Sequence, residues 1–307
     1  MIGLGVAGVG WLGESLIKDI GAAPSLQLVA VQDVRLDRAR SVADQYACSL
    51  ATDSFDELLE HPTVDAVAIC TPNALHVPQA RQALAEGKHV LVQKPLALAA
   101  DDAASTVRLA QRQDRMLFVD YTYRFLETTR LLQQHAGTIR SVKAAFHNIY
   151  GPGTEKAWFF DAKLSGGGAL IDLGVHLLDL ALWLLQPASV ELTDARLENA
   201  PIDTAAHLRL RCDQMPVDVE VSWNAATPLT EISVELETDN GRWCWENVDG
   251  SFFRFRTRRD TEILLDRETS LRSDTLCAFE RALKTGNAPT IDVRVYELLE
   301  QAYRQAV

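Results

Sequence analysis

Apolar and polar positions in the first 120 residues alternate between two patterns. Short runs that are apolar at nearly every position are typical of strands buried on both faces of a parallel sheet. Between them lie longer stretches with the apolar spacing of one helix face. We predict strands at residues 1–7, 26–32, 48–52, 64–70, 89–93 and 116–120, with helices at 11–20, 36–47, 74–86, 101–113 and after the capping box Ser54–Glu57. This alternation predicts a doubly wound parallel sheet, whose ligands bind beyond the carboxyl ends of the strands.

From Thr138 onward the pattern changes, because strands begin to follow one another. We predict strands at residues 141–149, 190–197, 205–211, 217–223, 231–238, 242–246, 251–256 and 262–265. Turn residues mark a hairpin at Asp239–Gly241 and a loop at Gly151–Gly153. Strands in series beside long helices predict an α+β domain with an open, mainly antiparallel sheet. We therefore expect two domains, residues 1–120 and 121–307.

The segment 165–183, SGGGALIDLGVHLLDLALW, predicts a helix that is apolar on nearly every side and therefore buried. Asp172, His176 and Asp179 nevertheless fall on one stripe of it, at i, i+4 and i+7. Burying these groups costs several kcal/mol unless they are paired or face a wet cavity. They either fasten the helix internally or serve a function. The glycines 166–168 favour function, because they let another body approach the helix N-terminus.

Composition narrows the classes of partner. The chain of 307 residues carries a formal net charge of −12, which argues against nucleic-acid and anionic-membrane partners. Five scattered cysteines lack CxxC spacing and seven histidines lack an HExxH pattern, so we expect reduced thiols and no bound metal. No uncharged apolar run approaches about 20 residues and no basic leader precedes the first strand, so we expect no membrane span, no signal peptide and a cytoplasmic location.

A glycine pattern follows the first predicted strand and opens a helix. Gly8-Val9-Gly10-Trp11-Leu12-Gly13 is GxGxxG, in which the first glycine permits a tight turn, the second lets backbone approach a pyrophosphate, and the third packs helix on strand. Asp33 ends the second strand, where a carboxylate accepts hydrogen bonds from ribose hydroxyls and favours NAD over NADP. Arg35 is close enough to leave that preference open. Together these features predict a Rossmann-type dinucleotide site.

Three polar segments follow predicted strands at the ligand-binding edge. They are Thr71-Pro72-Asn73 with His76 just beyond, Gln93-Lys94-Pro95, and Tyr121-Thr122-Tyr123-Arg124-Phe125. We expect Thr71 to Asn73, His76, Gln93 and Lys94 to contact the cofactor. Pro95 holds Lys94 extended, which would direct its ammonium toward the ligand, although a lysine snorkelling at a strand end explains the position too. Tyr123 and Arg124 either bind substrate or join the two domains.

An aromatic cluster, Trp158-Phe159-Phe160, precedes the glycine-rich helix start. Aromatic rings stack on the apolar faces of sugars, so Trp158 is a candidate for the wall of a sugar pocket. Packing in an ordinary core explains the cluster equally well.

TPNALHVPQARQALAEGKHVLVQKPLAL together with SGGGALIDLGVHLLDLALW resembles the glucose–fructose oxidoreductase, inositol dehydrogenase and rhizopine-catabolism family, Gfo/Idh/MocA, over essentially the whole chain. In that family a Glu-Lys-Pro motif supplies a lysine that contacts the substrate hydroxyl, which Lys94 matches. The helix segment supplies an aspartate and a histidine, which Asp172 and His176 match. The resemblance also implies a homodimer or homotetramer formed through the C-terminal sheet.

The chain departs from the family pattern at two positions. Gln93 stands where the family has glutamate, which removes a carboxylate expected beside Lys94. Thr122 replaces an asparagine that is common in the family. These departures bear on the tuning of the site more than on the class of reaction, because Lys94 is retained.

The resemblance and the residues together predict an NAD(P)-dependent dehydrogenase acting on a hydroxyl-bearing carbon of a sugar or polyol, with the nicotinamide in a cleft between the domains. His176 is the expected acid–base group, since the ordinary pKa of histidine, about 6.5, is near working pH. Lys94 is expected to stabilise the alkoxide, and Asp172 to orient His176 or hold a second hydroxyl. We expect Asp179 to be structural. The alternatives are an NAD-dependent glycosidase of the same fold and a non-catalytic NAD(H)-binding regulator.

Overall fold

The computed structural model describes residues 1–149, 157–225 and 229–306. The loop expected at Gly151–Gly153 lies outside the described residues. The chain forms two compact units, one of Met1–Thr122 with Arg272–Ile291 and the other of Tyr123–Leu271 with Asp292–Val307.

The first unit is built on a six-stranded parallel sheet in the order β3-β2-β1-β4-β5-β6. Its strands are β1 (Ile2–Ala7), β2 (Leu26–Gln32), β3 (Leu50–Thr52), β4 (Ala66–Ile69), β5 (His89–Gln93) and β6 (Leu117–Asp120). The order reverses between β1 and β4, the position at which doubly wound sheets bind ligands. The prediction of a Rossmann sheet is confirmed.

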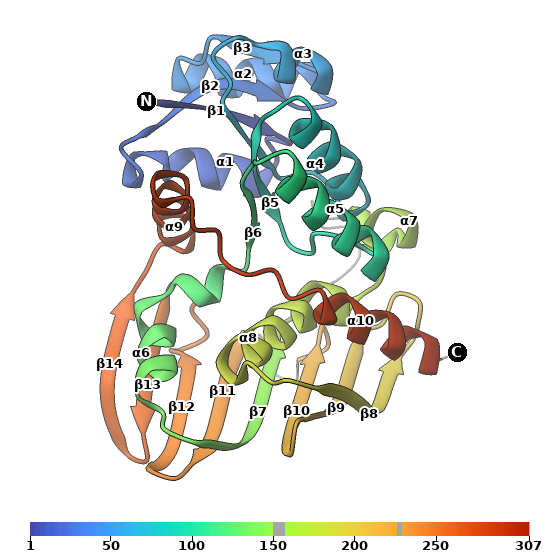
Figure 1. Cartoon of the computed structure of the whole chain (residues 1–307), viewed down its shortest axis with the longest axis vertical. Helices are drawn as coiled ribbons and strands as arrows, with labels where there is room; N and C mark the ends of the chain where they lie inside the picture. Colours follow the sequence, from blue (N-terminus) through green and yellow to red (C-terminus); the bar gives the residue numbers. More distant parts are fainter. Residues whose placement is uncertain (150–156, 226–228, 307) are drawn as a thin grey trace. The chain divides into compact units, whose positions relative to one another are not determined.

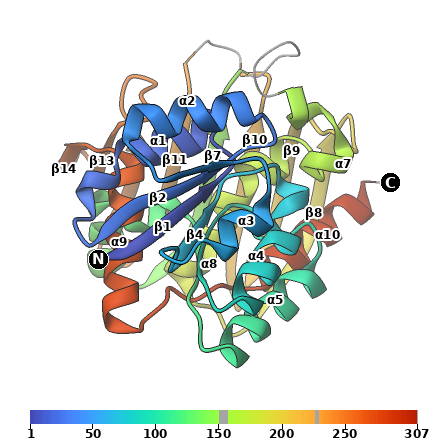
Figure 2. The ribbon, with the colours of Figure 1, turned by 90° about the horizontal axis from the view of Figure 1, so that it is seen from above.

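Helices cover both faces of this sheet. Figure 2 shows α1 (Trp11–Lys18) and α2 (Leu36–Tyr46) on one face, and α3 (Phe55–Glu60), α4 (His76–Ala85) and α5 (Ala100–Arg112) on the other. Because both faces are covered, the strands bury nearly every side chain, including all of β4. This burial is why they appear in the sequence as unbroken apolar runs.

The first unit also contains α9 (Leu271–Thr285), which the sequence placed with the second domain. Phe279 on α9 packs edge-on against Phe118 of β6, with ring centroids 5.4 Å apart. Arg272 and Thr275 bind the carboxylate of Asp120 at 3.0 and 2.6 Å. The residues in these contacts are some 150 positions apart in the sequence. No local pattern therefore predicts that α9 packs in the first unit.

The second unit is an eight-stranded, mainly antiparallel sheet in the order β14-β13-β12-β11-β7-β10-β9-β8, with β7 and β10 parallel (Figure 1). Its strands are β7 (Ile139–His147), β8 (Val190–Glu198), β9 (Ala205–Cys212), β10 (Met215–Ser222), β11 (Glu231–Thr238), β12 (Gly241–Asn247), β13 (Arg254–Arg259) and β14 (Glu262–Glu268). The predicted α+β architecture is confirmed. The strand expected at 251–256 begins three residues later, at Arg254.

One face of this sheet packs against helices α6 (Glu127–His135), α8 (Val175–Leu185) and α10 (Arg294–Gln305) (Figure 1). Inward side chains alternate along each strand, as in β11, where Ile232, Val234 and Leu236 are buried. The outward face carries charged pairs, including Arg242 with Glu235 and Arg256 with Glu246.

Of the residues that the structure describes, one stretch, Ala162–Leu185, has the length and composition to cross a membrane. It comprises the short helix α7 (Ala162–Ser165), a π-helical turn (Leu170–Gly174) and α8. In its most apolar window 83% is buried, as is typical of the core helix of a globular unit. The prediction of a single buried helix therefore holds for its burial, while the π-turn interrupts the expected α-helical spacing.

Candidate functional site

The glycine turn of the first unit contains three glycines. At Gly8 and Gly13 the fold leaves no room for a side chain, whereas Gly10 faces open space. Gly8 has φ +80°, and a Cβ there would lie 2.8 Å from the Cys70 carbonyl oxygen. A Cβ on Gly13 would lie 2.0 Å from the Gly8 carbonyl oxygen. A Cβ on Gly10, by contrast, would meet only the Arg38 guanidinium, at 3.5 Å. The backbone at Gly10, at the start of α1, is thus accessible to a phosphate group.

Asp33 lies beside this turn, as expected. It is 7% exposed, and its Oδ2 accepts a hydrogen bond from the Val9 amide at 3.1 Å. Its Oδ1 accepts one from the Arg35 amide at 3.0 Å. These bonds hold the carboxylate between the end of β2 and the glycine turn, where its remaining lone pairs can accept bonds from ribose hydroxyls. The cradle and the carboxylate together fit a dinucleotide.

The basic residue nearest Asp33 is one that the sequence analysis missed. The Arg35 guanidinium is 3.3 Å from the exposed Asp37 carboxylate. Arg38 Nη1 is 4.0 Å from Asp33 Oδ2 and also borders Gly10. Arg38 lies three residues after Arg35, on the same side of the first turn of α2, and this spacing is the signal that could have identified it.

Trp11 and Leu12, also expected to contact the cofactor, begin α1 directly after Gly10. Trp11 is 60% exposed and Leu12 is half-buried. An exposed tryptophan on the first turn of a helix leaves a large apolar surface available to a ligand.

The loop after β4 packs against the glycine turn. A Cβ on Gly8 would lie 3.0 Å from the Thr71 Cγ2 atom, and Thr71 donates a hydrogen bond to Gln79 at 2.6 Å. Pro72 and Asn73 begin a short helical turn in which Asn73 is 5% exposed. His76 is 1% exposed, so it is no surface residue. Its ring nitrogens lie 2.7 Å from the Pro95 carbonyl oxygen and 2.8 Å from that of Thr71.

Gln93 and Lys94 end β5, as predicted. Lys94 is half-buried. The side-chain amide of Gln93 donates a hydrogen bond to Asp120 Oδ2 at 2.6 Å. A carboxylate on the neighbouring strand, that of Asp120, thus binds the residue that stands in place of the family glutamate. Asp120 was missed, although it is the polar residue that closes an apolar strand, the same signal that identified Lys94. Thr122 lies near this network, 3.4 Å from the Thr275 hydroxyl.

In the second unit, the glycines before Asp172 serve a structural purpose, which corrects our expectation that they admit a ligand. A Cβ on Gly167 would lie 2.1 Å from the Tyr303 hydroxyl, and one on Gly168 would lie 1.9 Å from the Asp203 carbonyl oxygen. The Asp203 carboxylate accepts bonds from the Gly168 amide, the Leu170 amide and the Tyr303 hydroxyl at 2.8, 2.7 and 2.5 Å. The chain's own carboxylate therefore occupies the anion position at this helix start. Burial raises the pKa of Asp203 against these hydrogen bonds.

Asp172 lies beside an aromatic wall. It is 6% exposed, and its Oδ2 accepts a hydrogen bond from Trp223 Nε1 at 3.2 Å. Phe160 and Phe159 pack around the Trp223 ring with centroids 5.7 and 6.2 Å away, and the half-buried Trp158 stacks on Phe159 at 4.2 Å. Both readings of the Trp158 cluster therefore have support, since it packs on the core and keeps a partly open aromatic surface near a carboxylate.

His176 is half-buried at the first turn of α8. Its ring centroid is 5.0 Å from that of Tyr123 and 6.5 Å from that of Phe146. Tyr123 is 4% exposed and also packs against Trp245 and Phe255. Tyr123 thus forms the aromatic floor beneath His176, which gives it a packing role.

Arg124 and Asp179 form a buried, two-pronged ion pair. Arg124 Nε donates to Asp179 Oδ2 at 2.6 Å, and Arg124 Nη2 donates to Oδ1. The two residues are 5% and 1% exposed. The structural role expected for Asp179 matches this contact. We no longer count Arg124 among the substrate ligands, because its guanidinium is directed at a buried carboxylate.

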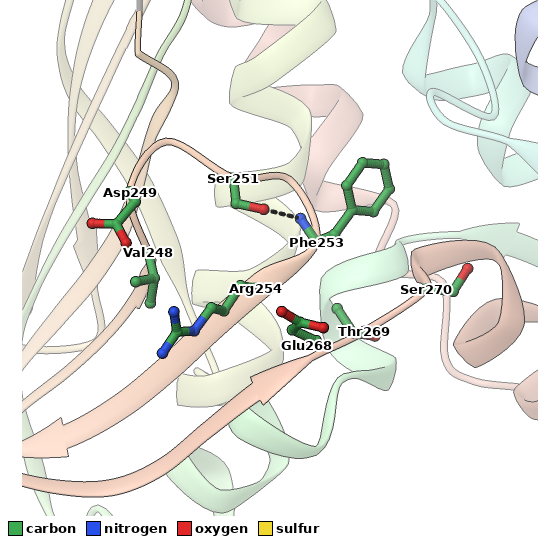
Figure 3. A pocket seen from close by; sticks show the side chains of 8 residues that line it. All are labelled: Val248, Asp249, Ser251, Phe253, Arg254, Glu268, Thr269 and Ser270. Carbon is green, nitrogen blue, oxygen red and sulfur yellow. Dashed lines mark hydrogen bonds between the residues drawn. The ribbon is translucent and has the colours of Figure 1, made fainter.

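A surface hollow of about 500 Å³ lies at the β12–β13 turn and the end of β14 (Figure 3). It is lined by Val248, Asp249, Ser251, Phe253, Arg254, Glu268, Thr269 and Ser270. The Ser251 hydroxyl accepts a hydrogen bond from the Phe253 amide at 3.0 Å, and Arg254 is paired with Asp266. None of the predicted site residues lines this hollow. Among the described residues, no cluster of three or more His, Cys, Asp or Glu side chains could hold a metal.

Comparison with known families agrees with this arrangement. Residues 2–121 match the profile described as "Oxidoreductase family, NAD-binding Rossmann fold", and residues 126–243 match the "GFO/IDH/MocA C-terminal domain". The chain therefore belongs to the GFO/IDH/MocA oxidoreductase family and carries its NAD-binding domain. The resemblance seen in the sequence is confirmed.

Curated relatives are named as enzymes of sugar chemistry. The chain is 32% identical over 180 residues to D-glucoside 3-dehydrogenase of Escherichia coli (strain K12), and these residues are 55% of this chain and 50% of the relative. It is 30% identical to D-xylose 1-dehydrogenase (NADP(+)) 2 of Haloferax volcanii over 99% of this chain and 96% of the relative. The matched segment spans about half the length of the Escherichia coli relative.

Solved structures share the fold over nearly the whole chain. GenD2 from gentamicin A biosynthesis, in complex with NAD, is 26% identical with a TM-score of 0.85, covering 99% of this chain and 94% of that one. Levoglucosan dehydrogenase, in complex with NADH and L-sorbose, has a TM-score of 0.85 at 17% identity, covering 99% and 97%. The second likeness shows the fold alone.

Proposed function

We propose that the protein is an NAD(P)-dependent oxidoreductase that moves a hydride between nicotinamide and a hydroxyl-bearing carbon of a sugar, polyol or sugar derivative. The observation that carries the proposal is that a member of this family keeps Lys94, Asp172 and His176 alongside an accessible glycine turn with Asp33 beside it. The names of the curated relatives support the class of substrate.

The first unit supplies the groups that would hold the cofactor. The Gly10 backbone and the start of α1 would bind the pyrophosphate, and Asp33 the adenosine ribose. Trp11, Leu12 and the loop Thr71–Asn73 border this cradle. When bound, the nicotinamide ring supplies the carbon that accepts or donates the hydride.

Lys94 and His176 would have separate roles at the substrate hydroxyl. The proposal requires that both side chains contact this hydroxyl. In the oxidising direction the hydroxyl proton passes to His176 as the hydride leaves the carbon, so that a carbonyl forms and the histidine becomes positively charged. The His176 Nδ1 atom is buried, so we assign proton uptake to Nε2. The Lys94 ammonium stabilises the negative charge that develops on the oxygen.

Asp172 and the Trp158 side of the aromatic wall would bind the rest of the sugar. The Asp172 carboxylate accepts a hydrogen bond from Trp223 Nε1 beside this wall, and a carboxylate is an acceptor suited to sugar hydroxyls. Because Trp223 donates to Asp172 and is itself packed by Phe159 and Phe160, the carboxylate is held in one orientation.

We further propose a cytoplasmic homodimer or homotetramer that associates through the outward face of the C-terminal sheet. That face carries charged pairs such as Arg242 with Glu235 and Arg256 with Glu246. An interface built on such pairs is weakened by salt, because salt screens exposed charges. Sedimentation at low and high ionic strength tests the assembly.

The direct test is the appearance of NADH absorbance when purified protein is mixed with NAD or NADP and a panel of aldoses, inositols and sugar acids. A rise with one sugar supports the proposal and identifies the substrate and cofactor together. Cofactor binding with no rise for any sugar would contradict it. Cleavage of aryl glycosides would then indicate the glycosidase, and its absence the regulator.

Cofactor choice gives a separate prediction. In Asp33→Asn, the residue keeps its shape but no longer repels a 2′-phosphate, and Arg38 remains nearby to pair with one. We expect the ratio of kcat/KM for NADP to that for NAD to rise by about tenfold or more. Adding Arg38→Ala should remove most of that gain.

The matched control is Arg40→Ala, since Arg40 is an exposed arginine on the same helix. Steady-state kinetics with both cofactors measure the ratio. An unchanged ratio in Asp33→Asn would show that this carboxylate does not choose the cofactor.

A further inference from the structure

The residues on either side of Lys94 are both anchored within the first unit. We propose that His76 and Asp120 are positioning residues that clamp the backbone of Lys94, one through Pro95 and the other through Gln93. This inference rests on the proposed function, which gives Lys94 its role.

The clamp on the C-terminal side is His76. Its Nδ1 lies 2.7 Å from the carbonyl oxygen of Pro95, the residue after Lys94. Its Nε2 lies 2.8 Å from the Thr71 carbonyl oxygen. Both partners are carbonyl oxygens, which only accept, so a neutral ring donates to one of them and lies against the other. Because the ring is 1% exposed, losing the donated bond leaves a buried polar atom unsatisfied.

These contacts join the Lys94 segment to the cofactor cradle. The Thr71 side chain borders Gly8 of the glycine turn. The Thr71 carbonyl contacts one nitrogen of His76, and the other nitrogen contacts the Pro95 carbonyl. Two loops that follow different strands of the sheet are therefore held together by one ring. The charge of Lys94 also contributes to lowering the pKa of His76, which burial lowers most, so the two side chains interact electrostatically.

The clamp on the N-terminal side is Asp120. Gln93 pairs with Asp120 across β5 and β6, and its amide donates to Asp120 Oδ2. Arg272 donates to the same oxygen at 3.0 Å, and the Thr275 hydroxyl donates to the other at 2.6 Å. Asp120 is 1% exposed, and three donors from two elements fix its position. The Gln93 side chain is thereby prevented from rotating, and the peptide that leads into Lys94 is held.

A clamp of this kind matters because small displacements of a catalytic group have large effects. A shift of about 1 Å can cost on the order of a hundredfold in rate. A flexible four-carbon side chain on a mobile loop would lose further entropy each time it engaged the substrate. When the backbone on both sides of Lys94 is fixed, motion of the loop no longer adds to this entropy cost.

The two His76 contacts can be separated by isosteric replacement. In His76→Asn the amide nitrogen takes the place of Nδ1 and can still donate to Pro95. In His76→Gln it takes the place of Nε2 and can donate to Thr71 instead. We expect His76→Asn to keep kcat within about threefold, and His76→Gln to lose about tenfold or more in kcat with unchanged affinity for the cofactor.

His89→Gln is the matched control. His89 begins the same strand, β5, and its Nδ1 accepts a bond from the Met116 amide at 3.0 Å. We expect His89→Gln and His76→Gln to lose thermal stability to a comparable extent. A loss of kcat in His76→Gln alone supports the inference that His76 positions Lys94. Equal kcat values for His76→Asn and His76→Gln would overturn the His76 half of the clamp.

The Asp120 half is tested by exchanging donor and acceptor. Gln93→Glu alone places two buried carboxylates in contact, and Asp120→Asn alone leaves Arg272 without its carboxylate, so we expect each to lower kcat. The double variant Gln93→Glu/Asp120→Asn restores one carboxylate and one amide. Because Arg272 still lacks the Asp120 carboxylate in this variant, we expect partial recovery, to a kcat above that of either single variant. Losses that simply add in the double variant would overturn this half.

A readout independent of turnover separates this inference from the proposed function. The chain has seven lysines, so ¹³C-dimethylation of their amines yields few NMR signals, and Lys94→Arg assigns that of Lys94. We expect its signal to shift or broaden in His76→Gln and to stay in place in His89→Gln. Protein without turnover on any sugar contradicts the proposed function, whereas an unchanged Lys94 signal in His76→Gln contradicts the clamp.

Discussion

Replacing Lys94 by alanine is expected to lower kcat by about a hundredfold or more while cofactor affinity stays the same. The ammonium acts on charge that develops on the substrate oxygen as the hydride moves, so its loss affects the transition state more than the bound substrate. His176→Ala should cost a similar factor, because the proposed mechanism assigns the hydroxyl proton to this histidine. Steady-state kinetics with the active sugar, together with fluorescence titration of NADH, separate the two effects.

Each of these variants has a control in its own unit. Lys88→Ala removes a lysine just before β5, whose Nζ donates to the Val64 carbonyl oxygen at 2.7 Å. His135→Ala removes an exposed histidine at the end of α6 in the second unit. We expect both controls to retain kcat within about twofold. If Lys94→Ala and His176→Ala also retained it, the assigned mechanism would be wrong.

The second large effect concerns stability. Arg124→Met is expected to lower the free energy of unfolding by about 3–5 kcal/mol at pH 8, because Asp179 is left as a buried charge without its guanidinium. Chemical denaturation followed by circular dichroism measures the change. Arg304→Met serves as control, since its pair with Glu300 is a surface pair within one helix and contributes little.

The loss in Arg124→Met should depend on pH. Burial raises the pKa of Asp179 to about 7 against the opposing attraction of Arg124. A raised carboxyl pKa means that the folded protein holds the proton more tightly than the unfolded chain. The contribution of this group to stability is therefore complete below about pH 4 and is lost as pH rises to about 7. Arg124→Met should thus be least destabilised near pH 5, where Asp179 is protonated, and most destabilised at pH 8.

A double variant distinguishes the charge from the packing. Arg124→Met/Asp179→Leu replaces the pair by apolar side chains, and we expect it to recover most of the stability lost in Arg124→Met. A double variant as unstable as the single one would show that packing around Arg124, and not the unpaired carboxylate, sets the cost.

The parallel sheet of the first unit was predicted well because its signals are local. Residues 26–32 and 89–93 match β2 and β5 as strands, and Gly8 and Gly13 have the turn and packing roles that their pattern implies. Strands covered on both faces bury every side chain, so the apolar run itself marks the strand. Lys94 was identified as a polar residue at the end of an apolar strand. The same criterion applied to the next strand would have identified Asp120.

The glycines before Asp172 show where local reasoning fails. Small residues at a helix start indicate that something approaches closely, but they do not say what. In the structure the approaching groups are Asp203 and Tyr303, some 35 and 135 residues further along the chain. Arg124 likewise seemed suited to a substrate, and only its contact with Asp179 shows that it belongs to the core.

The sequence by itself determined the order of the strands, the helices between the strands of the first sheet, the two folds, the dinucleotide turn with Asp33, and the identity of Lys94, Asp172 and His176 as candidates. It did not predict helices α6 and α9. The predicted features depend on residue type and on short spacings along the chain, and both act through local interactions of the backbone. The tertiary structure alone decided which polar groups satisfy one another: Arg124 with Asp179, Asp120 with Gln93 and Arg272, and Asp203 at the glycine-rich helix start. A buried polar atom must find a partner wherever the fold brings one, and that pairing is a property of three-dimensional packing that no spacing along the chain records.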